Sequence, residues 1–507
     1  MPPSTHHHPA SPSGIRMSDP WPGSFYAQQN ASAFNTTARV LLLFGVSEHG
    51  TTLSRDGQAG APNWRMEQYT GLVNLALAFP ELANSQQWLD VGLQAITREL
   101  ENEVYPDGIE TEQASGYDIM SAGNFFHVLA LLNKTGRGTP AGFYNGVEQM
   151  FNYAAYCVDQ HGYLPRDGDA DYGQPWPGLK DELAFFNRSD WKYVVSGGAA
   201  GIPPQGPPTV LFPYGGQFIM RSGWHPEDQW AFFDVGPYGS SGHAHRDKLH
   251  INIRANGSQL LVDSGRFAYN GENATWHSEY APTTRAHNTL TLDGCNQANS
   301  PATVSQPVAN DTYSIGDSYD TARARMSEWD GLAGAANHTR ALLYRRGAYW
   351  LVVDVVDTDR PRQVQATWHV HPDAGLVAEN LGAGVGPVRA NVTGVPATMS
   401  LALVPEAGSP WVNASIVKGL QPPEAPYQGW YSRNYTDCRP APVLVYDAAI
   451  PTGRSLAAWL LVPAAGATPP GDAALRLVRQ NETHAVFDVS PGAGAATVEE
   501  TVNIGPC

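Results

Sequence analysis

The hydrophobic pattern of this chain changes its period once, and that change limits the folds open to it. Before residue 195, apolar side chains recur at helical spacing, as in the run from Asn63 to Leu82 and in the next run, for which Ser85 is the expected N-cap. Beyond the Gly- and Pro-rich stretch 196–208 they alternate with polar residues or run continuously between turns, as in strands. The sequence therefore predicts an α+β multidomain protein.

The helical part reads as antiparallel pairs of helices. Two further helical runs, 117–132 and 141–158, follow the first two at short intervals, and helical hairpins of this kind are typical of an α/α toroid. Too few runs fit before residue 190 for a full toroid, so we expect a partial one. The predicted organisation is a disordered or truncated N-terminal tail at 1–35, a toroid-like helical domain at 36–195, a linker at 196–208 and a large antiparallel β-sandwich at 209–507.

The composition is that of a globular protein with a sizeable core. Of the 507 residues, 42% are hydrophobic and 16% are charged. The formal net charge of -17 argues against nucleic acid and against an anionic membrane as partners. It leaves a polyanionic substrate open, because a local basic cleft can override the net field, although it disfavours a heavily sulfated one.

One stretch, 241–294, concentrates side chains capable of chemistry. His243 and His245 stand just before a strand pattern, and Asn256-Gly257 is a strong two-residue hairpin signal. The hairpin returns the chain to Asp263, so this carboxylate and His245 can approach each other despite their separation in sequence. His287 begins the next strand-like run and is a third candidate.

Two neutral imidazoles and one carboxylate form a plausible zinc shell with a position left for water or substrate. The sequence thus predicts a metal site at His245, Asp263 and His287 and leaves His243 for proton transfer. The alternative is that these side chains are ordinary hydrogen-bonded residues at strand ends. Their order along the chain favours the site, because a pair of histidines alone would be a weak signal.

This order of motifs resembles the heparinase II/III-like superfamily of polysaccharide lyases. The matching segments within 212–294 are His-Ala-His-x-Asp-x-Leu from His243, the Asp-Ser-Gly turn at 263–265 with Tyr269 beyond it, and the pair His287-Asn288. Upstream, Asn63-Trp64-Arg65 and the segment 107–117 are similar to the family's first domain. The resemblance implies an α/α toroid followed by a β-sandwich, with the active site in a cleft between the two.

The resemblance also implies roles for four residues. Lyases of uronate polymers remove the C5 proton, neutralise the neighbouring carboxylate and protonate the leaving C4 oxygen. By position, Asn63 would neutralise the carboxylate, His243 and Tyr117 would serve as bases, and Tyr269 would serve as the acid. Asn63 could instead cap its helix and Tyr117 could be a buried helix residue, and Tyr280 competes with Tyr269. The zinc would be mainly structural and would hold the His243 turn.

Three further residues are candidates for substrate binding. Trp64 stands where several alginate-lyase branches have His, which removes a possible base, supplies a stacking surface and puts alginate in doubt. Glu112 either orients Tyr117, binds a sugar hydroxyl or is a solvated surface charge. Arg285 either holds a carboxylate or braces the sandwich. Asp118, where many members have His, is a second departure from the pattern.

The sequence has some features of a secreted protein but lacks a recognisable signal peptide. Twelve Asn-x-Ser/Thr triplets indicate a glycoprotein that follows a secretory route. Four cysteines, Cys157, Cys295, Cys438 and Cys507, could form two disulfides in three possible connectivities. However, the N-terminus has no apolar stretch long enough for a signal peptide, so we expect either an upstream start or another export route.

The sequence therefore predicts a secreted lyase that cleaves (1→4) bonds to uronic acids in an acidic polysaccharide. The expected cofactor is a divalent metal, with no organic cofactor and no nucleic acid or membrane partner. A uronate C5-epimerase is a close alternative, because it needs nearly the same residues. A noncatalytic glycan-binding protein is a third possibility, although binding alone would not require both a base and an acid.

Overall fold

The computed structural model describes residues 10–18, 20–56, 62–240, 242–271, 275–300, 304–380, 387–411 and 413–507. The chain forms two compact units. Unit 1 comprises Met1–Thr111 and Tyr117–Tyr153, and unit 2 comprises Glu112–Gly116 and Ala154–Cys507. Unit 2 thus begins well before the predicted linker, and it contains a five-residue segment from within the helical part of the sequence.

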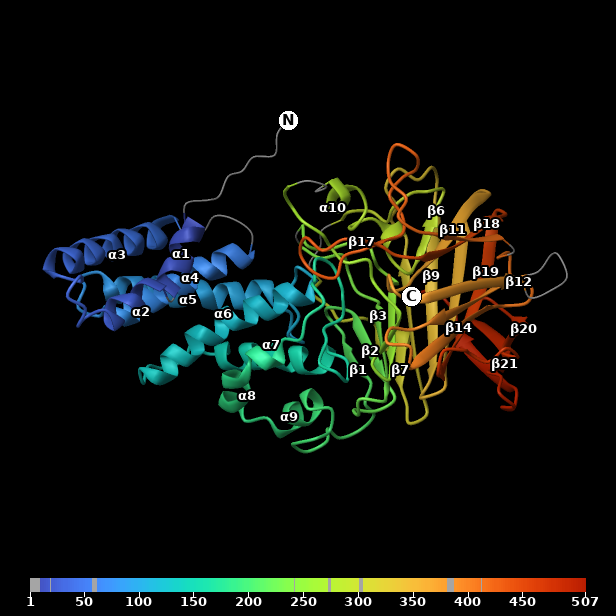
Figure 1. The fold of residues 1–507 in the computed structure, drawn as a ribbon, viewed down its shortest axis with the longest axis horizontal. Helices are drawn as coiled ribbons and strands as arrows, with labels where there is room; N and C mark the ends of the chain where they lie inside the picture. The colour runs from blue at the N-terminus through green and yellow to red at the C-terminus, as the bar shows by residue number, and fades with distance from the viewer. Residues whose placement is uncertain are drawn as a thin grey trace. The chain divides into compact units, whose positions relative to one another are not determined.

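Unit 1 is built from helices paired in hairpins (Figure 1). The predicted runs are helical, and α5 begins at Ser85 itself, so that Asn84 and not Ser85 occupies the N-cap position. The Ser85 hydroxyl donates instead to the carbonyl of Phe79. The helices are α1 (Ala10–Ser18), α2 (Pro20–Ala27), α3 (Thr36–Asp56), α4 (Pro62–Ala78), α5 (Ser85–Glu103), α6 (Ser115–Lys134) and α7 (Phe143–Cys157), the last two of which cross between the units.

The N-terminal segment is a correction to the sequence analysis, because α1 and α2 lie within the stretch predicted to be disordered. The backbones of α1 and α4 approach closely at Gly14 and Gly71, where any Cβ would meet a main-chain oxygen. Asn74 of α4 donates from Nδ2 to the carbonyls of Met17 and Ser18, both at 2.7 Å, and so satisfies the end of α1. Tertiary packing thus orders a short helix that the sequence pattern alone does not predict.

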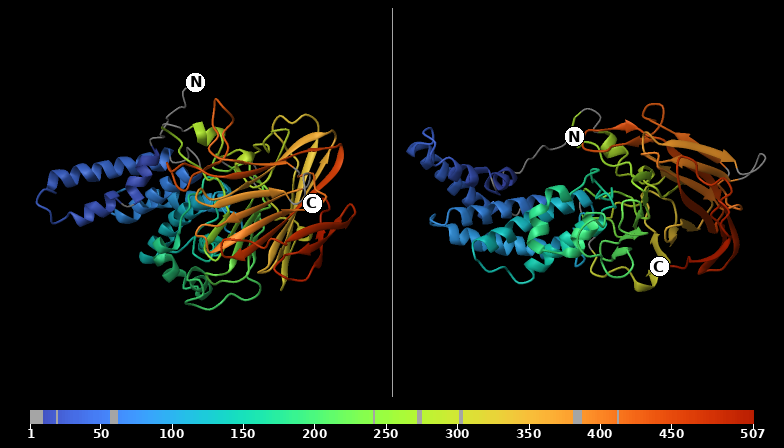
Figure 2. Two further views of the ribbon diagram at one scale, coloured as in Figure 1. Left: turned by 45° about the vertical axis from the view of Figure 1, so that its right-hand side comes forward. Right: turned by 60° about the horizontal axis from the view of Figure 1, so that its bottom comes forward.

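Unit 2 is an antiparallel β-sandwich with short helices in its connections (Figure 2). Its helices are α8 (Lys180–Phe186), α9 (Ser189–Val195), α10 (Thr275–Glu279), η1 (Trp176–Gly178), η2 (Thr284–Ala286) and η3 (Asn310–Thr312). A five-stranded sheet follows chain order: β1 (Val210–Phe212), β2 (Gln217–Arg221), β3 (Gln229–Asp234), β4 (Ile251–Ala255) and β5 (Ser258–Leu261).

The remaining strands form four further sheets. An eight-stranded sheet has the order β12 (Gly375–Asn380), β13 (Val388–Thr393), β14 (Met399–Pro405), β19 (Gly453–Ala465), β10 (Tyr349–Thr358), β9 (Ala336–Arg345), β8 (Tyr319–Met326) and β7 (Tyr313–Ile315). A four-stranded sheet has the order β15 (Asn413–Val417), β18 (Val443–Ile450), β11 (Arg362–His369) and β6 (Leu290–Leu292). The smaller sheets are β16 (Trp430–Tyr431) with β17 (Arg439–Pro440), and β20 (Ala474–Gln480), β21 (His484–Ser490) and β22 (Val498–Asn503).

The eight-stranded sheet lies between two hydrophobic cores. On β10, Trp350 and Val352 belong to the core shared with the five- and four-stranded sheets, whereas Leu351 and Val353 belong to the core shared with β20, β21 and β22. Successive side chains of a strand point to opposite faces, so a strand buried on both faces reads as a continuous apolar run. The sequence of β10 is accordingly apolar from Tyr349 to Val356 except at Asp354.

The predicted hairpin is confirmed. Ala255 pairs with Ser258, and Asn256 and Gly257 both adopt positive φ, 44° and 70°, as a tight two-residue turn requires. Farther along, the pair His287-Asn288 precedes β6, and Asn288 donates from Nδ2 to the carbonyls of Ile251 and Val262 at 2.8 and 3.0 Å. The hairpin and the later strand are thereby joined, which positions the candidate site.

Candidate active site

The ring of His243 is oriented by a buried carboxylate. Its Nδ1 lies 2.6 Å from Oε2 of Glu112, a side chain that is completely buried. The main chain is also fixed, because the amide of Asp169 donates to the carbonyl of His243 at 2.9 Å. Because Nδ1 is directed at the carboxylate, the nitrogen on the far side of the His243 ring is Nε2. Glu112 therefore contacts His243 within unit 2, a partner that the sequence analysis did not foresee.

Asp169 contacts three side chains that are far from it in sequence. Its Oδ1 lies 3.0 Å from Nε2 of His245, its Oδ2 accepts from the Tyr269 hydroxyl at 2.8 Å, and Nδ1 of His277 is 3.8 Å away. Burial opposes ionisation of Asp169, but the hydrogen bonds from His245 and Tyr269 outweigh it and lower its pKa. The sequence analysis missed this residue, although three aspartates at alternate positions, 167, 169 and 171, were a visible signal.

Tyr269 is the more accessible of the two candidate tyrosines. Its side chain is 38% exposed, and its ring centroid lies 6.2 Å from that of His243. Arg266 donates to the Tyr269 oxygen at 2.9 Å while it binds both carboxylate oxygens of Asp171. Tyr280, by contrast, is fully buried and donates to Gln428 at 2.6 Å, and burial raises its pKa. The structure therefore brings Tyr269, and not Tyr280, beside His243.

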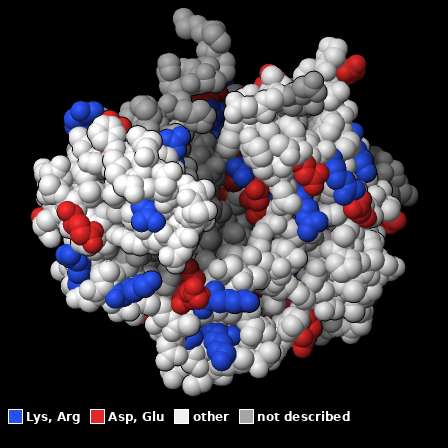
Figure 3. Space-filling view, turned by 60° about the vertical axis from the view of Figure 1, so that its left-hand side comes forward, with Lys and Arg blue, Asp and Glu red and all other residues white. Residues whose placement is uncertain are grey.

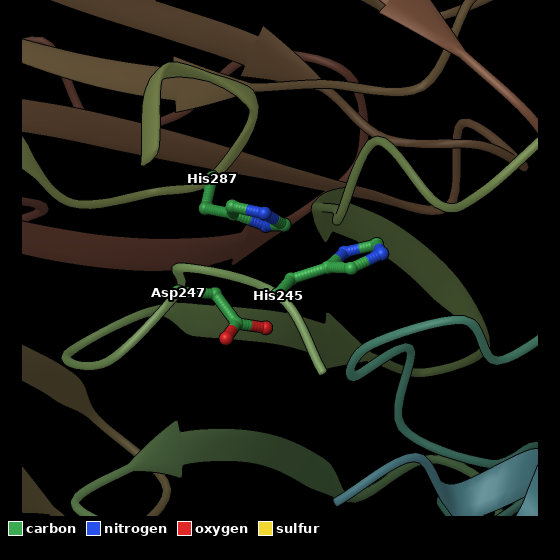
Figure 4. Close-up of side chains that lie close together, drawn as sticks. All are labelled: His245, Asp247 and His287. Atoms are coloured by element: carbon green, nitrogen blue, oxygen red, sulfur yellow. The ribbon is translucent and has the colours of Figure 1, made fainter. Parts of the chain in front are cut away.

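Two overlapping groups of side chains have metal-ligand geometry among the described residues. One is His245, Asp247 and His287 (Figure 4), and the other is His250, Asp263 and His287. In the first group, His245 Nδ1 and His287 Nε2 are buried and have no hydrogen-bond partner. Figure 4 shows that the two rings come from different loops and lie close together, with Asp247 beside them. Orphaned imidazole nitrogens beside a carboxylate fit a divalent metal.

The predicted metal ligands are therefore divided between these groups. Asp263 holds His287 through an Oδ2 contact of 2.7 Å to Nδ1, and its Oδ1 accepts from the amide of Gly265 at 2.6 Å. Burial opposes ionisation of Asp263, but the interaction with His287 outweighs it and lowers the pKa well below its usual range. In this arrangement Asp263 orients one imidazole ligand, and Asp247, which the sequence analysis did not assign, offers the nearby carboxylate.

The remaining predicted residues have separate surroundings. Asn63 and Tyr117 belong to unit 1, where Asn63 is buried in the first turn of α4 and its Oδ1 accepts from the amide of Trp64 at 3.0 Å. Asp118 is also buried and accepts from the amide of Glu110. Arg285 lies in unit 2 on η2 and donates to the carbonyl of Glu279 at 3.0 Å.

None of the four cysteines forms a disulfide in the structure, so the two disulfides that the sequence allows are not formed there. Cys157 is buried at the end of α7, where its Sγ contacts the carbonyl of Ala154. Cys507, the last residue of the sequence, is exposed. Burial raises the pKa of Cys438 to about 12, so its thiol is neutral.

Comparison with known proteins covers both parts of the chain. Residues 12–190 match the family described as Heparinase II/III N-terminus, and residues 204–444 match Heparinase II/III-like, C-terminal. A heparin-sulfate lyase of Pedobacter heparinus is 23% identical over 374 residues, 70% of this chain and 53% of the relative. A heparin-sulfate lyase of Bacteroides stercoris is 26% identical over 245 residues, 46% of this chain and 36% of the relative. The chain thus spans about half the length of the Pedobacter relative and a smaller share of the Bacteroides relative.

Solved structures share the fold. A mutant heparan sulfate lyase from Pedobacter heparinus has a TM-score of 0.77 at 20% identity over 96% of this chain and 74% of that chain. A heparinase III has a TM-score of 0.77 at 15% identity, covering 97% of this chain and 75% of that one. The toroid-plus-sandwich architecture expected from the sequence is therefore confirmed. With both family patterns present in order and this fold beneath them, the protein belongs to the heparinase II/III-like superfamily of polysaccharide lyases.

Proposed function

We propose that the protein is a polysaccharide lyase that cleaves (1→4) bonds to uronic acids by β-elimination, in a substrate of the heparan sulfate class. The observation that carries the proposal is the pairing within unit 2 of His243, oriented by Glu112, with Tyr269, held between Arg266 and Asp169. A candidate base and a candidate acid on neighbouring side chains fit the reaction. The substrate class is supported by the curated relatives, which are heparin-sulfate lyases.

The chemistry follows from these contacts. Nε2 of His243 accepts the C5 proton, and the Glu112 carboxylate stabilises the resulting imidazolium. The electrons of the C5–H bond form the C4–C5 double bond as the C4–O4 bond breaks. Tyr269 gives its proton to the leaving O4, and the Arg266 guanidinium stabilises the phenolate. Proton exchange with solvent then restores both groups.

Four assignments rest on the resemblance. Asn63 would neutralise the uronate carboxylate, Tyr117 would act as a second base, Trp64 would stack on a sugar and Arg285 would bind a carboxylate. The indole of Trp64 is partly exposed, and burial lowers the pKa of Arg285 without removing its charge at neutral pH. Glu112, by contrast, acts in this proposal through His243 and not on the sugar.

A zinc ion is part of the proposal. His245 and His287 would hold it, with a carboxylate from Asp247 or Asp263, and it would fix the turn that carries His243. Burial opposes protonation of His245, but the interaction with Asp169 outweighs it and raises its pKa.

Secretion and glycosylation are also proposed. Nine of the twelve sequon asparagines are exposed, two are partly buried and Asn273 lies outside the described residues. Sugar attachment requires accessible side chains, so the exposed positions suit a glycoprotein. No helix in the described part of the chain is long and apolar enough to cross a membrane.

The charge distribution favours a substrate of low sulfation. On the face shown in Figure 3, Lys and Arg side chains are scattered among Asp and Glu and do not gather into one basic patch. Dense sulfation is best recognised by clustered guanidinium groups, and the net charge of -17 repels polyanions at long range. We therefore expect weakly sulfated heparan sulfate to be a better substrate than heparin.

The test is incubation of the purified protein with heparan sulfate, heparin, chondroitin sulfate and alginate while the ultraviolet absorbance of unsaturated uronate is followed. We expect a rise with heparan sulfate that His243→Ala abolishes and that His484→Ala, a change at an exposed histidine of β21, leaves intact. Absence of a rise with every polymer would refute the lyase. Deuterium uptake at C5 without new absorbance would then identify an epimerase, and binding without either would identify a glycan-binding protein.

A further inference from the structure

A cavity of about 300 Å³ lies within unit 2 where four segments of the chain meet. Its walls are Phe267, α10, the loop that leads into β16 and the turn before β17; the lining residues are Phe267, Trp276, Gln421, Tyr427, Trp430, Thr436 and Cys438. This volume is at the lower end of the range for ligand pockets in proteins, and it suits a single sugar ring.

The cavity is adjacent to the candidate acid. Phe267 directly follows Arg266, and Thr436 directly follows Tyr435, whose ring centroid lies 5.9 Å from that of Tyr269. Arg266 lies over both tyrosine rings, at 5.5 and 5.1 Å from their centroids. The residues that position Tyr269 therefore continue directly into the wall of the cavity.

The walls of the cavity are held in place by hydrogen bonds. The indole of Trp430 donates to the carbonyl of Leu420 at 2.8 Å, and Tyr280 donates to Gln428 at 2.6 Å. Leu420 and Gln428 are also joined as a β-bridge. A site fixed before binding loses little conformational entropy when a ligand enters, which favours a specific function over a gap in packing.

The chemistry of the walls selects the ligand. Tyr427 and Trp430 are only partly buried, so their rings present apolar surface and a polar edge to anything that enters. Every described residue that lines the cavity is uncharged, including Cys438, whose thiol burial keeps protonated. Two arginines lie next to the lining residues along the chain, but Arg266 pairs with Asp171 and Arg439 pairs with Asp373. Asp437, which precedes Cys438, would repel an anion.

We propose that this cavity is a subsite for a neutral, N-acetylated hexosamine unit of the polymer, next to the uronic acid at Tyr269. The aromatic rings receive the apolar face of the pyranose, and Gln421 and Thr436 supply hydrogen bonds to its amide and hydroxyl groups. The assignment of a polymer neighbour rests on the proposed lyase function, whereas binding of the sugar itself does not. The subsite makes sulfation of this unit a barrier to binding, because the walls offer no cation.

The test is saturation-transfer difference NMR on the full chain, with the methyl glycoside of N-acetylglucosamine as the probe. We expect transfer to the ring and acetyl protons in the native protein and in His243→Ala. Both Trp430→Ala and Tyr427→Phe should weaken it, the first by at least tenfold and the second modestly. The 6-O-sulfated probe should give little transfer. Equal transfer in Trp430→Ala, or equal transfer from the sulfated probe, would overturn the proposal.

A matched control and a kinetic arm separate this subsite from the lyase proposal. Tyr319→Ala removes an exposed aromatic ring on β8, outside the cavity, and should leave transfer unchanged. In the elimination assay, Trp430→Ala should raise KM at least tenfold with little change in kcat. Sugar binding without elimination in the native protein would refute the lyase alone, whereas elimination with KM unaffected by Trp430→Ala would refute the subsite alone. A folded-state check by circular dichroism accompanies Trp430→Ala, and Tyr427→Phe tests the same wall with less disturbance.

Discussion

The hydroxyl of Tyr269 donates to Oδ2 of Asp169 at 2.8 Å, although the two residues are 100 positions apart in the chain. The hydroxyl oxygen of Tyr269 also accepts a hydrogen bond from Arg266 at 2.9 Å. The phenol is thus held by one donor and one acceptor, which fixes its position. If Tyr269 protonates the leaving oxygen, these two neighbours determine how readily it does so.

For this reason Arg266→Lys should impair turnover more than binding. Lysine keeps the charge but cannot bind Asp171 through two atoms and Tyr269 through a third at the same time. We expect kcat for elimination to fall about tenfold or more, within the range for loss of acid–base assistance, with KM nearly unchanged. Tyr269→Phe should reduce kcat further, and Arg266→Lys in that background should add little. An additive loss in the double variant would contradict the shared role.

The Glu112→Gln variant should show how much activity depends on the orientation of the His243 ring, as distinct from the presence of the ring. The amide keeps the size of the side chain but removes the charge that stabilises a protonated His243 across their 2.6 Å contact. General-base assistance contributes roughly 10²–10⁴-fold, so we expect kcat to fall by about the lower of these factors and by less than in His243→Ala. Measurement of kcat and KM for both variants is the readout. A rise in KM with kcat unchanged would assign Glu112 to the sugar instead.

The metal proposal predicts that the native protein contains about one zinc per chain and that His245→Ala loses it. A ligand present at 100 times its Kd stabilises a fold by about 2.7 kcal/mol, so chelation should also lower Tm. Two carboxylate variants distinguish the two candidate groups of metal ligands. Zinc content measured by plasma mass spectrometry should fall most in Asp247→Asn if the first group is the site, and most in Asp263→Asn if the second is. Zinc retained in all three variants would exclude both.

A pair of glycine variants tests the packing of the N-terminal helix. A Cβ on Gly71 of α4 would lie 2.4 Å from the carbonyl oxygen of Gly14, whereas a Cβ on Gly123 of α6 meets nothing within 4 Å. Gly71→Ala should therefore lower the free energy of unfolding by about 1–3 kcal/mol, as overpacking does. Gly123→Ala should raise it by up to about 1 kcal/mol through helix propensity. Thermal unfolding of both variants gives the comparison, and a neutral Gly71→Ala would contradict the observed contact.

The pH dependence of stability should reveal His369. Burial lowers the pKa of this imidazole to about 3, and its Nδ1 lies 3.0 Å from Oδ1 of Asn288. Because the folded pKa lies below that of an unfolded histidine, about 6.5, stability is fully present above the latter and is lost as pH falls toward the former. Each unit corresponds to about 1.4 kcal/mol, so the loss amounts to several kcal/mol.

His369→Asn should flatten that loss, because an amide does not titrate. Burial raises the pKa of Asp167 to about 7, which acts in the opposite direction over part of the same range, so the difference between native protein and variant is the informative quantity. Urea unfolding between pH 7 and pH 4.5 measures it. Parallel curves for the two proteins would remove His369 from the explanation.

The sequence predicted those parts of the fold that depend on local patterns. The hairpin at Asn256 follows from two residues with a known preference for positive φ, and the burial of β10 on both faces follows from an apolar run that only Asp354 interrupts. Helix α1 was not predictable in this way. Its stability depends on Gly71 and Asn74 of α4, more than fifty positions later, and no periodicity within α1 itself indicates that partner.

The site was predicted to a similar extent. The rings of His245 and His287 lie together, with centroids 5.3 Å apart, as the order of the motifs led us to expect. Asp169 and Arg266 went unassigned, since their roles arise only from contacts across the fold, the first with His245 at a separation of 76 positions. Chain order alone also does not determine whether Asp247 or Asp263 faces the two imidazole nitrogens that have no hydrogen-bond partner.

The segment Glu112–Gly116 belongs to unit 2 although most of the chain on either side of it, up to Tyr153, forms unit 1. Proteins emerge from the ribosome N-terminus first, at about 5–20 residues per second. The Glu112 carboxylate is therefore made well before His243, some 130 positions later, and it remains without this partner until residue 243 has been synthesised. The proposed base therefore cannot be oriented by Glu112 until about half of the chain has been made. A nascent chain halted before residue 243 would lack both His243 and Tyr269, the proposed base and the proposed acid.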